Sequence, residues 1–600
     1  MDGITTWRSA KRLKPYVYER LDPKRQEIRL LEVLPDEPGQ PMQVKLRATK
    51  LPANYETISY AWGNPARTAC IEIRSGQRRQ LRVPFNTEAA LKRVRRHDRV
   101  RTVWIDAICI NQDSIEDRNQ QVAIMGRIYS SSLGNLVYLG ELEDPNMAPR
   151  IQHTIDDLLK HARSETDDLR TFDSALFDYA LWLAAQRRGL PFEVDFDAIY
   201  VVLKLPWLRR LWVLQEVIMA PNSIAFLGSL QLGLRDMLRA LVWWKRHATS
   251  DDQDISSACI CLSSLYYHLS KRGDWYARSV QSLYQLLMTA QEFQKSEPRD
   301  SVFALLSIMD EKSSSALSPD YTRPLSDILE SASRLAIQET QLVLGHIHHR
   351  PGDLERAEVA SWAMRVDREL DFEIDPVEIP QGYHQTYPVS EGPDETTGGW
   401  KSGVLYLVGR HADSVSMVAP VCTPSIYDDH EAFSVWLWQT VQSYTSVSGP
   451  SSREVKATTI AKTLCADNYN LRRYQQMQDD ERMSLEEGLL VALSPETTER
   501  TLNLLQAPHT YAPTSDGIFW VYLRNRRCFV TQQRRLGIGP RETQSGDIVA
   551  MLSGAEHPYI LRPLDDEQYQ LVGAAYVDGL MPGDLGVEWH SKEEEVFALV

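Results

Sequence analysis

Length, composition and charge already exclude several classes of protein. With 600 residues, 43% of them apolar, the chain is too long for one hydrophobic core and is expected to form two to four structural units. Its formal net charge of −15 excludes a nonspecific nucleic-acid binder, which needs a basic face. Its seven scattered cysteines match neither a disulfide framework nor a zinc site and favour a reducing compartment.

The N-terminus lacks the apolar stretch of a secretory signal. No apolar run approaches the roughly 18 residues that a membrane-spanning helix needs. We therefore expect a cytoplasmic protein with no membrane span. The chain also lacks the Walker loop, the H-E-x-x-H zinc motif, the G-x-S-x-G elbow and the dinucleotide-binding glycine motif, which disfavours ATPases, zinc proteases, α/β-hydrolases and ordinary dehydrogenases.

Strand and helix patterns alternate from residue 27 to residue 140. The sequence predicts strands at 27–34, 55–63 and 135–140, a hairpin over 71–83 that turns at Ser75-Gly76, and helices that begin at Asn86 and Ser114. Residues 102–110 are almost continuously apolar, which is typical of a central strand covered on both faces. Strands that alternate with helices favour an α/β sheet with crossover connections.

The rest of the chain changes character twice. An acidic loop is expected at 141–150, then mainly helix to about residue 345 with a serine-rich loop at 313–315, and a linker or insertion at 385–403. The C-terminal third carries short strand patterns separated by turns, at 517–523, 527–532, 547–552, 559–561 and 569–572. This spacing predicts a small antiparallel barrel or sandwich.

Three segments of the first 230 residues carry the most specific motifs. They are YETISYAWG at 55–63, WIDAICINQ at 104–112 and RLWVLQE at 210–216. In sequence, order and separation they resemble the fungal heterokaryon-incompatibility (HET) domain. Looser likeness to long HET proteins extends over 299–306, 318–321 and 569–581, although Met364 stands where the family tends to have proline.

The resemblance implies a division of the chain. We expect a HET domain at 1–230 with its core motifs at 55–216, a helical region at 231–345, a linker or insertion region at 346–403, and a mixed region at 404–600 that ends in a small β-rich domain. HET domains are thought to be distant relatives of TIR domains. The resemblance therefore implies an α/β fold with a TIR-like (flavodoxin-like) N-terminal domain.

Glu216 is the candidate catalytic residue. In NAD-cleaving TIR domains the catalytic glutamate lies in a W-x-x-x-E segment, and Trp212 and Glu216 have this spacing here. If the segment is one helix, Leu208, Trp212 and Glu216 share a face, and burial beside the indole would raise the pKa of the carboxyl. A cleft carboxylate of this kind can stabilise the positive charge that develops as a glycosidic bond breaks. The alternative is a structural ion pair with Arg209 or another arginine.

Asp106 is the second candidate. An unpaired charge inside an apolar strand is costly, so Asp106 needs a partner or a place at the strand's carboxyl end, where open α/β sheets bind ligands. The candidate ligand-binding residues that would share this crevice are Tyr60, Trp62, Asp106, Asn111, Gln112 and Trp212. The equally supported alternative is a buried carboxylate that caps the loop 111–113 through backbone N–H groups.

Two other groups invite a chemical reading. Cys109 lies in an apolar run, where thiols are usually inert. His346-Ile347-His348-His349 lacks the carboxylate or cysteine pattern that would complete a metal site, so a surface segment is expected. We therefore predict no metal and no resident cofactor.

The resemblance implies a death effector in fungal nonself recognition. Such a protein would act by assembly with itself or with another incompatibility protein. The main alternative is an NAD glycohydrolase, with NAD as substrate and Glu216 as the catalytic carboxylate. A third possibility is an accessory protein of a secondary-metabolite pathway. Because a fold does not fix a function, the sequence leaves all three open.

Overall fold

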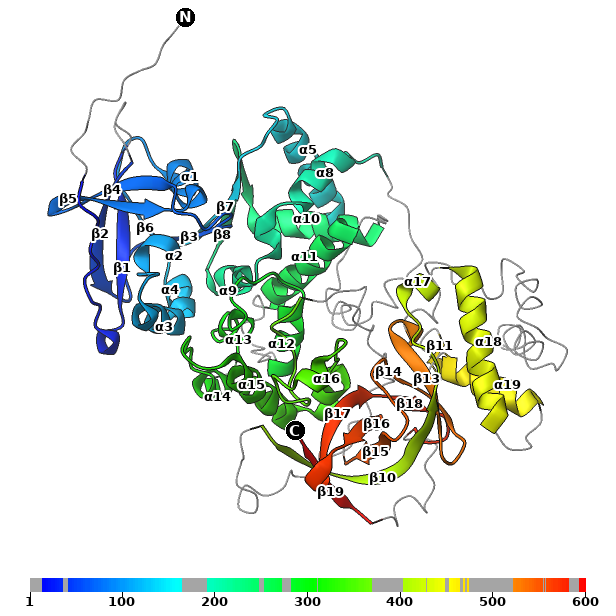
Figure 1. Cartoon of the computed structure of the whole chain (residues 1–600). Helices are drawn as coiled ribbons and strands as arrows, with labels where there is room; N and C mark the ends of the chain where they lie inside the picture. Colours follow the sequence, from blue (N-terminus) through cyan, green and yellow to red (C-terminus); the bar gives the residue numbers. More distant parts are fainter. Residues whose placement is uncertain are drawn as a thin grey trace, which may run out of the picture. The chain divides into compact units, whose positions relative to one another are not determined.

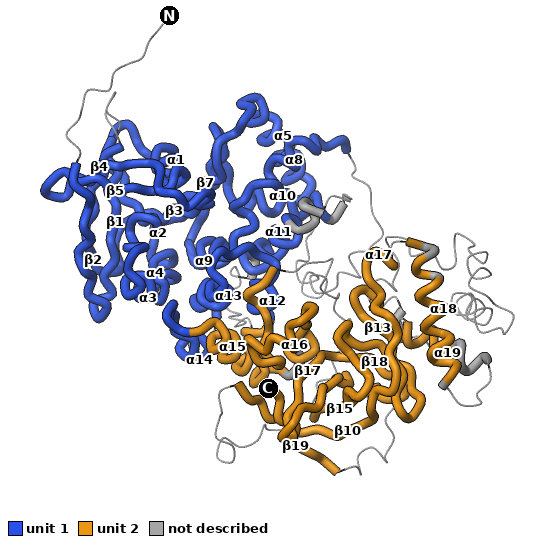
Figure 2. The backbone as a smooth tube through the Cα atoms, viewed as in Figure 1, with its two compact units in different colours: residues 1–172, 187–281, 285–323 blue, residues 173–186, 282–284, 324–600 orange. Residues whose placement is uncertain are grey.

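The computed structural model describes most of the chain in two compact units. The described residues are 13–35, 42–164, 192–247, 253–271, 282–309, 311–369, 403–427, 429–447, 453–464, 468–469, 472–473, 522–553, 555, 557–581 and 593–600. Unit 1 comprises residues 1–172, 187–281 and 285–323, and unit 2 comprises 173–186, 282–284 and 324–600 (Figure 2). Of the linker predicted at 385–403, residues 385–402 lie outside the described residues.

A nine-stranded mixed sheet forms the centre of unit 1, in the order β5-β4-β2-β1-β6-β3-β7-β8-β9 (Figure 1). The strands are β1 (Glu27–Val33), β2 (Gln43–Lys50), β3 (Glu56–Tyr60), β4 (Ala69–Ser75), β5 (Gln77–Val83), β6 (Arg101–Trp104), β7 (Asn135–Gly140), β8 (Ser223–Leu227) and β9 (Leu230–Gly233). Neighbours within the row β6-β3-β7-β8 are parallel. The α/β sheet with crossover connections is confirmed.

The hairpin over 71–83 is confirmed as β4 and β5, with Gly76 at the turn in the left-handed region (φ +74°). The long strand predicted at 102–110 is wrong. It ends at Trp104, and residues 106–109 form the single helical turn α2 (Asp106–Cys109). The Asp106 carboxylate accepts a hydrogen bond from the Ala107 amide (2.7 Å), which competes with sheet pairing and favours a turn.

Helices connect the strands of unit 1 and continue after the last of them, β9. Besides α2 they are α1 (Phe85–Val94), α3 (Ile115–Ala123), α4 (Met125–Ser130), α5 (Met147–Ser164), α8 (Phe196–Leu203), α9 (Trp212–Met219), α10 (Leu234–His247), α11 (Gln253–Lys271), α13 (Asp300–Phe303) and α14 (Glu311–Ala316), with the short turns η1 (Pro23–Arg25) and η3 (Pro206–Arg209). A further helix, α12 (Leu283–Gln291), crosses the division between the units.

The helix starts were predicted with mixed success. Ser114 caps α3 as predicted, because its hydroxyl accepts from the Asp117 amide. Asn86 does not cap α1; its side-chain amide donates instead to the Ala61 carbonyl. The serine-rich loop at 313–315 is wrong, since these residues lie in α14. The loop at 141–150 is shorter than predicted, because α5 begins at Met147.

The core of unit 1 is a cluster of buried side chains around the parallel strands. Trp104 and Tyr129 meet there edge to face, with ring centroids 5.7 Å apart. The helix α1 packs on β3 and β7, and α4 packs on α9. This packing fixes the carboxyl ends of β3 and β6 relative to α9.

Unit 2 is built around a second, eight-stranded sheet, in the order β15-β16-β17-β19-β10-β13-β14-β18. Its strands are β10 (Leu405–Val418), β13 (Arg526–Thr531), β14 (Leu536–Pro540), β15 (Ile548–Leu552), β16 (Tyr559–Pro563), β17 (Gln568–Ala574), β18 (Tyr576–Val577) and β19 (Glu595–Leu599). An extra pairing of β10 with β15 closes five strands into a ring. The long, curved β10 that makes this closure is visible in Figure 1.

Helices and a small hairpin complete unit 2. They are α15 (Leu325–Glu339), η4 (Gln341–His346), α16 (Asp353–Arg356), α17 (Pro424–Tyr427), α18 (His430–Val447), α19 (Arg453–Leu464), η6 (Asp565–Glu567), β11 (Asn468–Tyr469) and β12 (Arg472–Arg473). Four of the five predicted C-terminal strands are confirmed as β13, β15, β16 and β17. The fifth, at 517–523, is helical at Tyr522 and Leu523, and residues 517–521 lie outside the described residues.

No helix in the described part of the chain is long and apolar enough to cross a membrane.

Candidate functional site

The candidate site lies where β3 and β6 end. These strands are parallel, so their carboxyl ends lie at the same edge of the sheet. Ser59 and Tyr60 close β3, and Asp106 follows β6 by two residues. Glu216 comes from the middle of α9, which begins 108 residues after the end of β6 at Trp104 (212 − 104).

Glu216 is almost wholly enclosed, with 3% of its side chain exposed. The Ser59 hydroxyl donates to one carboxylate oxygen of Glu216, and Trp207 in turn donates from its indole nitrogen to the Ser59 oxygen (2.8 Å). Arg210 lies 3.8 Å from the other oxygen of Glu216 and also donates to the Tyr60 carbonyl. Both carboxylate oxygens thus face a partner. We call the set Ser59, Trp207, Arg210 and Glu216 the glutamate network.

The alternative predicted for Glu216 was an ion pair with Arg209 or another arginine, and the structure has the other arginine. The arginine beside the carboxylate is Arg210. Leu208 does not share a helix with Glu216 either, because it belongs to η3 and α9 starts at Trp212. The break between η3 and α9 turns Arg210 toward the sheet.

Burial raises the pKa of Glu216 to about 7, against the opposing effects of Arg210 and the Ser59 hydrogen bond. The nearby charge of Asp106 acts in the same direction as burial. A carboxyl with this pKa exchanges a proton near neutral pH, which suits acid–base chemistry and conformational switching alike.

Asp106 lies on the more open side of the site. The Trp62 indole donates to one of its oxygens (2.8 Å), and the Ala107 amide donates to the other (2.7 Å). Burial raises the pKa of Asp106, while Arg210 lowers it. Arg210 therefore acts on both carboxylates, and the structure brings Tyr60, Trp62 and Asp106 together as predicted from the sequence.

Asn111, Gln112 and Trp212 are placed differently. The Gln112 side chain donates to the Asp106 carbonyl (3.0 Å), so it borders the site. The Asn111 side chain instead accepts from the Asp113 amide within its own loop. Trp212 donates to Asp300 (2.9 Å), a carboxylate outside the three motifs.

The loop cap proposed for Asp106 belongs to another residue. Asp117 accepts from the Asn111 amide (2.8 Å) and forms a two-pronged ion pair with Arg29, both bonds 2.9 Å long. Arg29 also donates to the Cys109 carbonyl. Asp117 thus organises the loop that follows α2, and Asp106 faces the strand ends.

Three members of the glutamate network were not among the predicted site residues. Ser59 and Arg210 stand inside the first and third motifs, and Trp207 lies three residues before Arg210. For Ser59 and Arg210 the available signal was their place in the motifs. A serine in a buried strand and an arginine just before an apolar helix both need hydrogen-bond partners.

The two remaining chemical candidates lie largely in the interior. Cys109 is fully buried, which raises the pKa of its thiol to about 12. The histidines at 346–349 are not on the surface as predicted, because His346 and His349 are buried in unit 2 and His349 meets the Leu571 carbonyl. Among the described residues no group of histidine, cysteine or carboxylate side chains could hold a metal ion.

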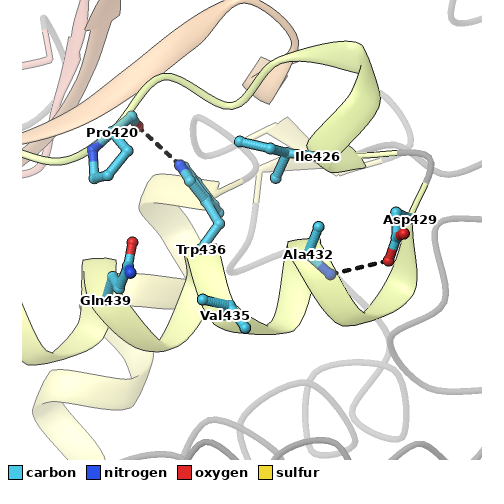
Figure 3. A pocket seen from close by; sticks show the side chains of 7 residues that line it. All are labelled: Pro420, Ile426, Asp429, Ala432, Val435, Trp436 and Gln439. Carbon is cyan, nitrogen blue, oxygen red and sulfur yellow. Dashed lines mark hydrogen bonds between the residues drawn. The ribbon is translucent and has the colours of Figure 1, made fainter.

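A hollow of about 420 Å³ lies in unit 2 between α17 and α18 (Figure 3). Its walls are largely apolar, and Asp429 is the one ionisable side chain among its lining residues. The Trp436 indole donates to the Pro420 carbonyl, and Asp429 accepts from the Ala432 amide. These polar groups hold the chain in place, and the hollow contains none of the residues predicted to form a site.

Comparison with known families connects this geometry to a protein class. The family model described as heterokaryon incompatibility protein (HET) matches residues 55–216, from the first residue of the first motif to the last residue of the third. Over these residues the chain is similar to the HET family. All members of the glutamate network lie within the matched span.

The C-terminal region matches a second family model. It is described as the Het-6 beta-barrel domain and covers residues 441–600, which include seven of the eight strands of the unit 2 sheet. A protein of Neurospora crassa, heterokaryon incompatibility protein 6, OR allele, is 24% identical over 656 aligned positions covering 92% of each chain. No solved structure matches. These findings support a role in heterokaryon incompatibility.

Proposed function

We propose that this protein is an effector of heterokaryon incompatibility that triggers cell death, and that its HET domain acts by assembly with itself or with another incompatibility protein. The similarity to heterokaryon incompatibility protein 6 over nearly the whole chain supports this assignment. The presence of both the HET and the barrel regions supports it further.

The observation that carries the proposal is the glutamate network. It joins the first motif to the third, so residues of two separate motifs meet at one buried carboxylate within the matched span. With 3% of its side chain exposed, Glu216 cannot touch a ligand or a partner unless α9 moves. A domain closed in this way suits an effector that stays inactive until assembly shifts it to another conformation.

NAD cleavage is the second candidate activity. The parallel strands follow the chain order 2-1-3-4 across the row β6-β3-β7-β8, which agrees with a flavodoxin-like, TIR-like domain. Trp62 and Asp106 border the strand ends, where a nicotinamide nucleotide would lie against Glu216 once α9 opens. In that state the ionised carboxylate would stabilise the oxocarbenium ion as the bond to nicotinamide breaks.

A growth test with one substitution checks both ideas. The full chain and its Glu216→Gln variant are expressed from an inducible promoter in a fungal host, while growth and cellular NAD are followed. Glu116→Gln, a substitution at a carboxylate whose side chain is 59% exposed, is the matched control. We expect the wild type and the control to arrest growth and Glu216→Gln to lose this effect.

The NAD readings separate the two mechanisms. If the carboxylate is catalytic, NAD falls only in cells that arrest, and the purified Glu216→Gln variant cleaves NAD roughly 10²–10³ times more slowly than the wild type. Arrest without a fall in NAD would support signalling by assembly and end the enzymatic proposal. A well-expressed wild-type chain that leaves growth untouched would contradict the effector proposal itself.

A further inference from the structure

Outside the span that the HET model matches, unit 1 contains a segment whose polar side chains bond to helices of the matched span, which we call the seam. It consists of residues 300–307 together with Asp320 and Tyr321, and it contacts the helices α3, α4 and α9 of the matched span. Figure 1 shows α13, the first part of this segment, beside α9. Residues 301–306 are buried, so the seam is part of the core of unit 1.

The seam anchors α9 at two points. The Trp212 indole donates to one oxygen of Asp300 (2.9 Å), and the Tyr321 hydroxyl donates to the other (2.7 Å). An indole N–H can only donate, so this bond needs an acceptor at Asp300. One turn further along α9, the Gln215 side chain donates to the Ser307 hydroxyl (2.7 Å). Glu216 is the next residue.

The same seam is fixed to α3 and α4. The Arg118 guanidinium lies 3.8 Å from the centre of the Tyr321 ring, and the Asn119 side chain accepts from the Tyr321 amide (3.1 Å). The Gly126 amide donates to the Ser307 hydroxyl (3.2 Å). The seam therefore connects α9, which carries most of the third motif, to α3 and α4, which follow the second motif along the chain.

We propose that these residues form a latch, which holds α9 and Glu216 in the closed arrangement and whose release activates the HET domain. Exposing Glu216 requires α9 to move away from Ser59, and Trp212 and Gln215 cannot follow that movement while Asp300 and Ser307 hold them. Asp300 is thus a positioning residue that acts on Glu216 through α9. The activating effect rests on the function proposed above, whereas the holding effect does not.

The latch is tested on the full-length protein with Asp300→Asn and Tyr321→Phe. Tyr321→Phe removes one hydroxyl and keeps the ring beneath Arg118, so it serves if Asp300→Asn folds poorly. The matched control is Tyr138→Phe, whose hydroxyl bonds to Glu141 (3.1 Å). Amide hydrogen exchange of residues 212–219 should accelerate about tenfold or more in the latch variants, because a charged hydrogen bond is lost, and stay unchanged in the control.

Growth provides the second reading. The latch variants should arrest the fungal host at lower inducer levels than the wild type, and the double variant Asp300→Asn/Glu216→Gln should not arrest it. A residue that only stabilises the fold would weaken arrest when it is replaced. The latch is overturned if amide hydrogen exchange in α9 is unchanged in the latch variants. It is also overturned if exchange is faster but the variants arrest growth no more strongly than the wild type. If neither the wild type nor any variant arrests growth, the proposed function fails together with the activating role, and exchange alone decides the holding role.

Discussion

Glu216 and Asp106 show how two carboxylates of one site are held differently. Glu216 is enclosed and lies 3.8 Å from the Arg210 guanidinium. Asp106 accepts a hydrogen bond from the Trp62 indole at the more open strand ends. Burial raises the pKa of both groups. Each residue therefore carries an energetic cost when ionised, and that cost can be measured.

For Glu216 we predict a stability that depends on pH. A carboxyl whose pKa is raised to about 7 in the folded state binds more protons when folded than when unfolded, so the free energy of unfolding falls as pH rises from about 4.5 to 7. Glu216→Gln removes this dependence. Between pH 5 and pH 8 the variant should gain roughly 2–3 kcal/mol relative to the wild type in denaturant titrations. A variant less stable than the wild type at pH 8 would show that the Arg210 ion pair outweighs burial.

For Asp106 we predict a structural effect from Asp106→Ala. The substitution leaves the Trp62 indole nitrogen and the Ala107 amide without their acceptor, which should lower the free energy of unfolding by about 1–3 kcal/mol. Asp106→Asn, which keeps an acceptor for Trp62, should recover most of the loss. If Asp106→Ala melts like the wild type but loses growth arrest, Asp106 contacts a ligand instead.

At the scale of elements, short segments after each strand position the site. The Arg29–Asp117 ion pair links β1 to the start of α3 and, through the Asn111 amide, to the loop after α2. Because both side chains are buried, loss of either would leave an uncompensated charge. The helices α4 and α9 are also linked, because the Ser307 hydroxyl accepts hydrogen bonds from the Gly126 amide and the Gln215 side chain. At this point the backbone of α4 approaches Ser307 closely.

That close approach requires a glycine. A Cβ atom at Gly126 would lie 2.1 Å from the Cβ of Ser307, so Gly126→Ala forces α4 and the latch apart. We expect a loss of about 1–3 kcal/mol in the free energy of unfolding and faster exchange in α9. Ser307→Gly removes the clashing Cβ, so the double variant should be more stable than Gly126→Ala alone. Equal stability of the two would contradict a steric cause.

At the scale of the whole molecule, the HET match ends long before unit 1 does. The matched span stops at Glu216, and the contacts of unit 1 continue to Arg323. The domain boundary at 230 stays a prediction.

We predict that a fragment of residues 1–323 folds on its own, because it retains the latch and the buried residues 301–306. A fragment of residues 1–230 lacks both, so it should expose apolar surface and be cut faster by protease. Limited proteolysis and thermal melts of the two fragments provide the measurement. Equal resistance and a cooperative melt for the shorter fragment would place the functional boundary at 230.

The sequence by itself determined the α/β class of the N-terminal region, its HET motifs, the hairpin over 71–83 and four of the C-terminal strands. These features depend on local patterns: strand alternation, turn residues and contiguous motifs are all readable within a few residues. The strand predicted from the apolar run at 102–110 was wrong beyond Trp104. An apolar run indicates that a segment is buried, but it does not distinguish a buried strand from a buried helical turn.

Only the tertiary structure decided which charges meet. It paired Glu216 with Arg210, gave the loop cap to Asp117, buried His346 and His349, and brought Asp300 to Trp212 across 88 residues of sequence. It also closed the C-terminal strands into a ring through the pairing of β10 with β15. Such choices depend on which side chains share a low-dielectric interior, and the chain must fold before that interior exists.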